Sequence, residues 1–163
     1  MVRRIVIQRE HIIEGSYQLI IKQGFSKFNA RNIAKQIDCS TQPIYREFEN
    51  MNNLKMIMVK RVAAKYKDFL EDQRPCTINQ LTRLIVNYAT DYPEEFHRFF
   101  LQDDEMVKLA KEVTSTIFNT LDQPHSEALF AVYWPYCLGK AALAVLVPGE
   151  IQTTDDFQRL TGS

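Results

Sequence analysis

The feature that most constrains this chain is the spacing of its apolar residues, which recur mostly three and four positions apart. Such spacing gathers them on one side of an α-helix, whereas a half-buried strand would require alternation. Five glycines and six prolines in 163 residues leave few breaks between these segments. The pattern predicts an all-α fold, and a hydrophobic content of 45% is enough to form a core.

Local start and stop signals divide the chain into helices. Asn29 and Ser40 are expected N-caps of two short helices, Gly24 is a stop signal, and Thr77 with Gln80 forms the sequence of a capping box. The expected helices cover residues 8–23, 29–38, 41–48, 50 to about 73, 77–91, 93–102, 104–121 and 126–147, and residues 153–161 are expected to add a short turn or helix.

Charge is distributed unevenly along the chain, although 20 Lys and Arg balance 20 Asp and Glu overall. Residues 1–67 hold 13 basic and 5 acidic side chains, a net charge of +8, and residues 68–163 hold 7 and 15, a net charge of −8. A basic N-terminal part that faces a polyanion, followed by an acidic body, is the expected arrangement.

The helix expected over residues 41–48 has two chemically different sides. Ile44 and Phe48 fall on its inner edge, while Gln42 and Arg46 point the opposite way. Arginine can donate two hydrogen bonds to guanine and glutamine can pair with adenine, so a helix of this kind suits the major groove of DNA. The hydroxyl groups of Tyr45 and Thr41 can donate hydrogen bonds to phosphate oxygens. The alternative is a solvated polar face that binds nothing.

Residues 12–54 resemble the N-terminal domain of the TetR family of transcription regulators. The matching positions are Ile12, Gly24, Phe25, Phe28, Arg31, Ile33, Ala34, Ser40, Ile44, Tyr45, Phe48 and Leu54. The resemblance implies phosphate contacts and base contacts on a double-stranded DNA operator. Its expected DNA-binding residues are Asn29, Arg31, Thr41, Gln42, Pro43, Tyr45, Arg46 and Lys55. Glu47 departs from the family pattern, and it can either accept a bond from cytosine or hold Arg46 in place.

The resemblance also implies a division of labour along the chain. Residues 1–50 would form a helix-turn-helix DNA-binding domain, and residues 51–163 an effector-binding and dimerisation domain that begins with a connecting helix over residues 51–73. Family members are homodimeric, and most are repressors. The expected dimer seam lies on residues 126–147, at Leu129, Val132, Tyr136, Gly139, Leu143 and Leu146. A helical partner-binding protein that does not read DNA is the alternative function.

The body is rich in aromatic side chains, and core packing is the simplest role for most of them. A subset could instead line a pocket for an unidentified small-molecule effector. The expected effector-binding residues are Tyr88, Tyr92, Phe96, Phe118, Tyr133 and Cys137.

Other function classes find little support in the sequence. Cys39, Cys76 and Cys137 are too widely spaced for a metal cluster or a disulfide framework, and the three histidines lack motif partners. No signal-peptide core or uninterrupted apolar run of 18 residues is visible. We therefore expect a cytoplasmic protein without a metal, cofactor, enzymatic activity or membrane partner.

Overall fold

The computed structural model describes residues 8–123, 126–149 and 157, and this part of the chain is all-helical, with no strand. The prediction of an all-α protein is confirmed. The chain divides into two compact units, Met1–Arg61 and Val62–Ser163. The boundary falls inside one long helix, α4 (Met51–Asp72), which therefore contributes residues to both units.

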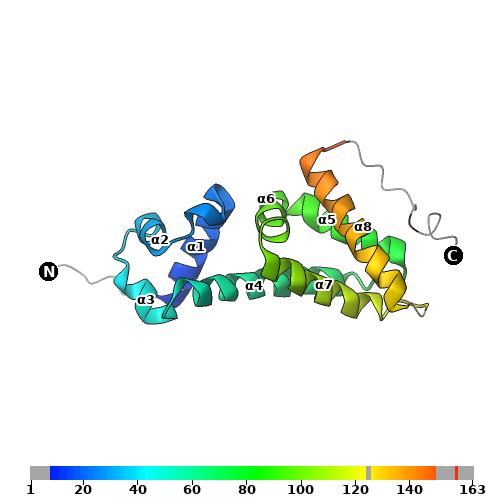
Figure 1. Cartoon of the computed structure of the whole chain (residues 1–163), viewed down its shortest axis with the longest axis horizontal. Coiled ribbons are helices and arrows are strands. Elements are labelled where there is room, and N and C mark those ends of the chain that lie inside the picture. Colours follow the sequence, from blue (N-terminus) through cyan, green and yellow to red (C-terminus); the bar gives the residue numbers. More distant parts are fainter. Residues whose placement is uncertain (1–7, 124–125, 150–156, 158–163) are drawn as a thin grey trace. The chain divides into compact units, whose positions relative to one another are not determined.

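From residue 8 onward, the first unit consists of three helices, a single 3₁₀ turn and the first half of α4 (Figure 1). They are α1 (Arg9–Gln23), η1 (Phe25–Lys27), α2 (Ala30–Gln36) and α3 (Gln42–Phe48). Their apolar faces form one core, whose most buried members include Ile12, Leu19, Ile20, Ile33, Ile44, Leu54 and Met58.

Most helix ends in this unit follow the local signals. Gly24 stops α1 with a φ of 80°, and the Asn29 side chain caps α2 by accepting a bond from the Asn32 backbone N–H at 2.9 Å. The N-cap expected at Ser40 is wrong by one residue, because α3 begins after Thr41. Pro43 lies in the first turn of α3 as predicted, where its missing N–H is tolerated.

A tight connection over residues 37–41 joins α2 to α3. Asp38, just after the end of α2, adopts a left-handed conformation with a φ of 52°. The following Cys39 N–H then bonds back to the Ala34 carbonyl at 2.9 Å and satisfies one of the open carbonyls at the end of α2.

An ion pair ties α1 to α4 within the first unit. Arg61 Nη1 and Nη2 donate to Glu10 Oε2 and Oε1 at 2.8 and 2.6 Å, although the two residues lie 51 positions apart. Hydrogen bonding and the positive charge of Arg61 hold the pKa of Glu10 below its ordinary value. Both side chains are exposed, so the two-point geometry fixes orientation more than it adds stability.

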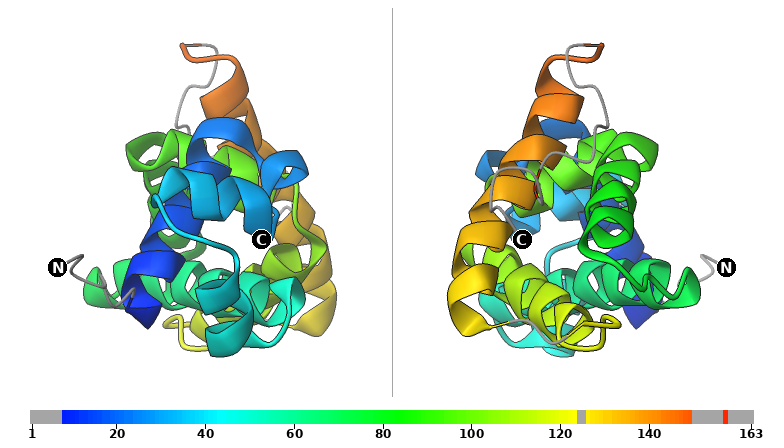
Figure 2. Two further views of the ribbon diagram at one scale, coloured as in Figure 1. Left: turned by 90° about the vertical axis from the view of Figure 1, so that its left-hand side faces the viewer. Right: turned by 90° about the vertical axis from the view of Figure 1, so that its right-hand side faces the viewer.

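The second unit contains the rest of α4 followed by a helical body. Its helices are α5 (Ile78–Asp91), α6 (Pro93–Glu95), the π-helical segment η2 (Phe96–Phe100), α7 (Asp104–Phe118) and α8 (Glu127–Leu146). The predicted capping box opens α5, since Thr77 and Gln80 bond reciprocally. α5 and α8 pack side by side (Figures 1 and 2).

The segment predicted as one helix over residues 93–102 differs from that expectation. Only Pro93–Glu95 is α-helical, and Phe96–Phe100 is a π turn. The wider turn lets Phe96, Phe99 and Phe100 all face the core.

α8 is the most apolar helix that the structure describes, with a window of mean hydropathy 1.5. By length and composition alone it could cross a membrane, although a helix of a soluble protein passes the same test. The helix does not contain an uninterrupted apolar run of 18 residues, because Glu127 and Lys140 lie within it. Only 28% of the window is buried, so much of α8 is an exposed apolar surface.

Candidate nucleic-acid interface

The polar side of α3 is exposed while its apolar side is buried. Ile44 and Phe48 retain 1% and 3% of their accessible surface, whereas half of Tyr45 remains exposed. Thr41 and Gln42 are also exposed, and Pro43 is half-buried. The two sides of this short helix are therefore separated as the sequence pattern predicts.

Arg46 and Glu47 form an ion pair on this exposed side. The Arg46 Nε lies 3.2 Å from Glu47 Oε1, and 62% of the Arg46 side chain is exposed. A guanine edge accepts two parallel bonds, which the two Nη groups of Arg46 can supply while Nε stays with Glu47. This ion pair is the contact by which Glu47 would hold Arg46 in place.

The remaining expected DNA-binding residues lie on the neighbouring helices of the first unit. Arg31 is exposed on α2, and Asn29 is exposed at its start. Lys55 is half-buried on α4, with its Nζ 5.5 Å from the centroid of the Phe25 ring. Lys35 adds another exposed cation on α2. Arg31, Lys35 and Lys55 thus carry positive charge on the helices that precede and follow α3 in the chain.

Arg9 is a residue of this region that the sequence analysis did not identify. Its Nη1 donates to the Glu47 carbonyl at 2.6 Å, and its guanidinium carbon lies 4.4 Å from the Phe48 ring centroid. The contact anchors the end of α3 to the start of α1 and borders a depression of about 380 Å³ that Met56 and Lys60 also line. No periodic pattern could have revealed a contact between residues 38 positions apart.

The expected effector-binding residues lie in two groups of the second unit. Tyr88 contacts Tyr92 and Phe100, with ring centroids 5.1 and 5.6 Å apart. Phe96 stacks on Phe100 at 4.8 Å. Phe118 instead stacks on Tyr133 at 4.9 Å.

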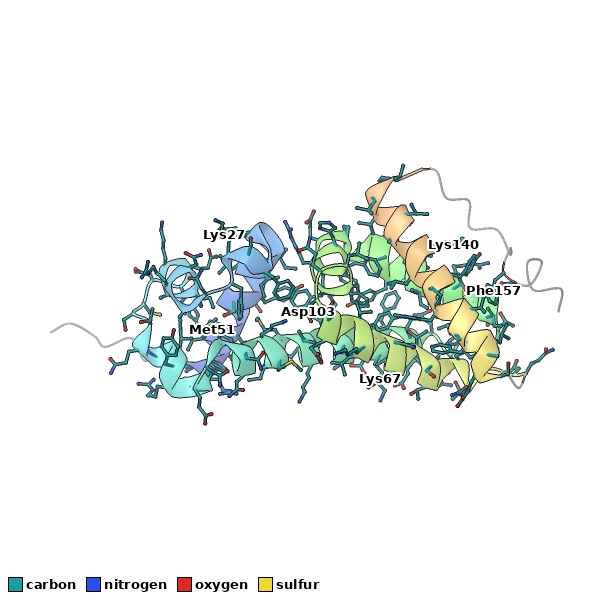
Figure 3. The ribbon with its side chains drawn as sticks, in the orientation of Figure 1. Lys27, Met51, Lys67, Asp103, Lys140 and Phe157 are labelled. Carbon is teal, nitrogen blue, oxygen red and sulfur yellow. The ribbon has the colours of Figure 1, made fainter. Side chains whose placement is uncertain are left out.

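Tyr133 and Phe157 are in edge contact, with ring centroids 5.3 Å apart, and Figure 3 shows Phe157 beside α8. Burial raises the pKa of the Cys137 thiol, which lies in the same group, to about 12, so this cysteine stays protonated and packs as an apolar residue.

Five of the six expected effector-binding residues are fully buried, and Tyr92 is 37% exposed. Ring contacts account for much of this burial, in keeping with the core-packing interpretation. Within the described ranges, no three His, Cys, Asp or Glu side chains are grouped closely enough to hold a metal ion.

Comparison with protein-family models, with curated proteins and with solved structures found no match to this chain.

Proposed function

We propose that this protein is a sequence-specific DNA-binding transcription regulator of the TetR type, in which α2 and α3 form a helix-turn-helix. The observation that carries the proposal is the two-sided α3, with Ile44 and Phe48 in the core and Gln42, Tyr45 and Arg46 in solvent. A buried apolar edge fixes such a helix to its domain while its polar face enters the major groove.

The exposed side chains have distinct roles in this proposal. Arg46 and Gln42 read base edges, since each can make two hydrogen bonds in the major groove. Thr41 and Tyr45 bind phosphate, together with Asn29, Arg31 and Lys55 on the adjoining helices. The excess of basic residues in the first 67 positions supports this assignment because phosphate contacts supply most of the affinity for DNA.

The protein acts as a homodimer in this proposal, since a single short helix reads too few base pairs for specificity. Support comes from an uncharged stripe on α8. Val132, Leu143 and Leu146 are 58%, 52% and 57% exposed, and a methyl group at Gly139 would meet nothing within 4 Å. A second copy of α8 fits this surface because a small residue permits close approach of two helices. The apolar side chains would then be removed from water.

The contact surface of the proposed dimer therefore differs in two residues from the seam predicted from the sequence. Leu129 and Tyr136 are half-buried within their own unit, while Ala128 and Pro135 are exposed. The stripe that faces the second copy comprises Ala128, Val132, Pro135, Gly139, Leu143 and Leu146, which fall within about 80° of the helix circumference. A groove of about 650 Å³ between α7 and α8 lies next to it.

Repression completes the proposal: the dimer blocks transcription at its operator, and a small molecule bound in the helical body releases it. The ligand would favour a state in which the two α3 helices are wrongly spaced for adjacent major grooves. The alternative, a partner-binding protein that does not read DNA, shares the same fold and differs in having no preferred DNA sequence.

Selection of operators from a randomised DNA library tests the proposal. The wild-type protein should enrich a two-part sequence, and Arg46→Ala should lose preference at one base position at a cost of about 1–3 kcal/mol. Tyr45→Phe is the matched control, because it removes only a hydroxyl aimed at phosphate and should weaken all sequences equally. No enrichment by the wild type would favour the partner-binding alternative, and an unchanged preference of Arg46→Ala would refute the assigned face.

A further inference from the structure

The last turn of α3 is held by side chains from α1 and α4. The final carbonyl groups of a helix have no backbone partner inside the helix, so other donors must satisfy them. Arg9 Nη1 donates to the Glu47 carbonyl at 2.6 Å, and Asn53 Nδ2 donates to the Phe48 carbonyl at 3.1 Å. The end of α3 is therefore fixed from two other helices of the first unit.

Arg9 contacts two consecutive residues of α3 with one planar group. Besides its bond to the Glu47 carbonyl, its guanidinium carbon lies 4.4 Å from the centroid of the Phe48 ring, and Phe48 is only 3% exposed. A guanidinium group that lies over an aromatic face has a restricted orientation. Because Phe48 is fixed in the core, this contact ties the backbone of Glu47 to the core as well.

Glu47 in turn contacts the proposed base reader, Arg46. Arg46 Nε lies 3.2 Å from Glu47 Oε1, and the Glu47 side chain is the less exposed of the two, at 29% against 62%. Consecutive side chains of a helix point about 100° apart, so the pair forms only when the two side chains lean toward each other. The direction of the Arg46 guanidinium group therefore depends on where Glu47 is held. Since Arg9 bonds to the carbonyl of Glu47, the carboxylate remains available to Arg46.

We propose that Arg9 is a positioning residue for base recognition, which acts through Glu47 to hold the guanidinium group of Arg46 in the direction of its base. This inference rests on the proposed function, in which Arg46 reads a base edge. A contact of two parallel hydrogen bonds requires its donors within about 0.5 Å of the productive position. Loss of Arg9 would release the last turn of α3 and weaken the preference for one base. Contacts to phosphate carry no base preference, so they would not produce this effect.

The other role open to Arg9 is that of one more positive charge near the DNA backbone. In that role its loss would lower the affinity for every sequence by a similar factor and change no base preference. Lys60 provides the comparison, because it is an exposed cation of α4 that lines the same depression as Arg9. Lys60→Met removes the same charge, and no bond joins Lys60 to α3 in the described part of the chain.

Operator selection from a randomised DNA library by variants of the full chain tests the proposal. Arg9→Met should lose at least about fivefold of the wild-type discrimination at the base position that Arg46→Ala also affects. Lys60→Met is the matched control and should keep the wild-type preference at every position. Arg9→Lys retains the charge and a more flexible donor, so its preference should lie between those of the wild type and Arg9→Met.

A double variant shows whether the effect passes through Arg46. In the Arg46→Ala background, Arg9→Met should cause no further change of base preference, because the group that it positions is already absent. Arg9 is exposed at the first position of α1, so Arg9→Met should stay folded and bind DNA without the selected site within about threefold of Lys60→Met.

The possible outcomes separate this proposal from the proposed function. An unchanged base preference in Arg9→Met would overturn the positioning role while the DNA-binding function stands. A further change of preference in the Arg46→Ala background would do the same. A wild-type chain that enriches no sequence would overturn the proposed function itself, and with it the role of Arg9 in base recognition.

Discussion

Ser16 is a polar residue in an apolar place, in the middle of the buried face of α1. The side chain is fully buried, and Oγ has no hydrogen-bond partner among the residues that the structure describes. Burying an unpartnered hydroxyl costs free energy, and alanine is the better helix former. Ser16→Ala should therefore raise the free energy of unfolding by about 1 kcal/mol in urea denaturation.

Thr114→Val provides the contrast, because this buried hydroxyl is partnered. Thr114 Oγ1 lies 2.9 Å from the Tyr66 hydroxyl and donates to the Ala110 carbonyl at 2.7 Å. Its removal leaves the buried Tyr66 hydroxyl without this partner and should lower the free energy of unfolding by about 1–2 kcal/mol. Destabilisation by Ser16→Ala would contradict the assignment of Ser16 Oγ as a buried hydroxyl without a partner.

At the scale of the element, the connection between α2 and α3 depends on Asp38. Its φ of 52° is a conformation that aspartate tolerates and β-branched residues avoid. Asp38→Gly should change the free energy of unfolding by less than about 1 kcal/mol, whereas Asp38→Val should lower it by about 1–2 kcal/mol. Urea denaturation of both variants measures the difference. Equal stability of the two would show that the turn can form without the left-handed residue.

The elements that the sequence predicts well are those specified by neighbouring residues. The Asn29 cap and the Thr77–Gln80 capping box involve bonds across three positions, so the residue types reveal them. The predicted N-cap of α3 is wrong by one residue because Ser40 and Thr41 are both residue types that cap helices well. Neither side chain caps the helix in the structure.

Long-range contacts and unusual turns could not be predicted in the same way. The bond from Arg9 to the Glu47 carbonyl and the Lys65 to Glu95 pair join residues 38 and 30 positions apart, and such distances leave no periodic trace. The π turn at Phe96–Phe100 was missed because apolar spacing does not distinguish it from an α-helix. Helical spacing alone separates the exposed residues of α3 from the buried ones, so the sequence predicts this exposed face correctly.

At the scale of the whole molecule, the change from a basic to an acidic sequence and the boundary between the two compact units both fall within α4. The basic part of the sequence covers residues 1–67, and the first compact unit ends at Arg61. In the proposed regulator this arrangement concentrates the cations where DNA binds. It also leaves an acidic body, which would repel DNA and restrict contact to the first unit.

The uncharged stripe on α8 yields the prediction for the assembled molecule. A homodimer held by this stripe should dissociate when a negative charge is placed within the stripe. The carboxylate would be buried against the apolar surface of the second copy without a positively charged group to pair with it. Leu143 is 52% exposed in the single chain, so Leu143→Glu should leave the free chain folded. In sedimentation velocity at micromolar concentration, the wild type should be a dimer and Leu143→Glu a monomer. Asn87→Glu, at an exposed position of α5, is the matched control and should stay dimeric.

Because one α3 reads only half of a two-part operator, Leu143→Glu should also lose operator affinity by at least about 100-fold while its weak non-specific binding changes little. A wild-type protein that sediments as a monomer, or that partitions into lipid vesicles through α8, would contradict the dimer and assign the stripe to a different partner.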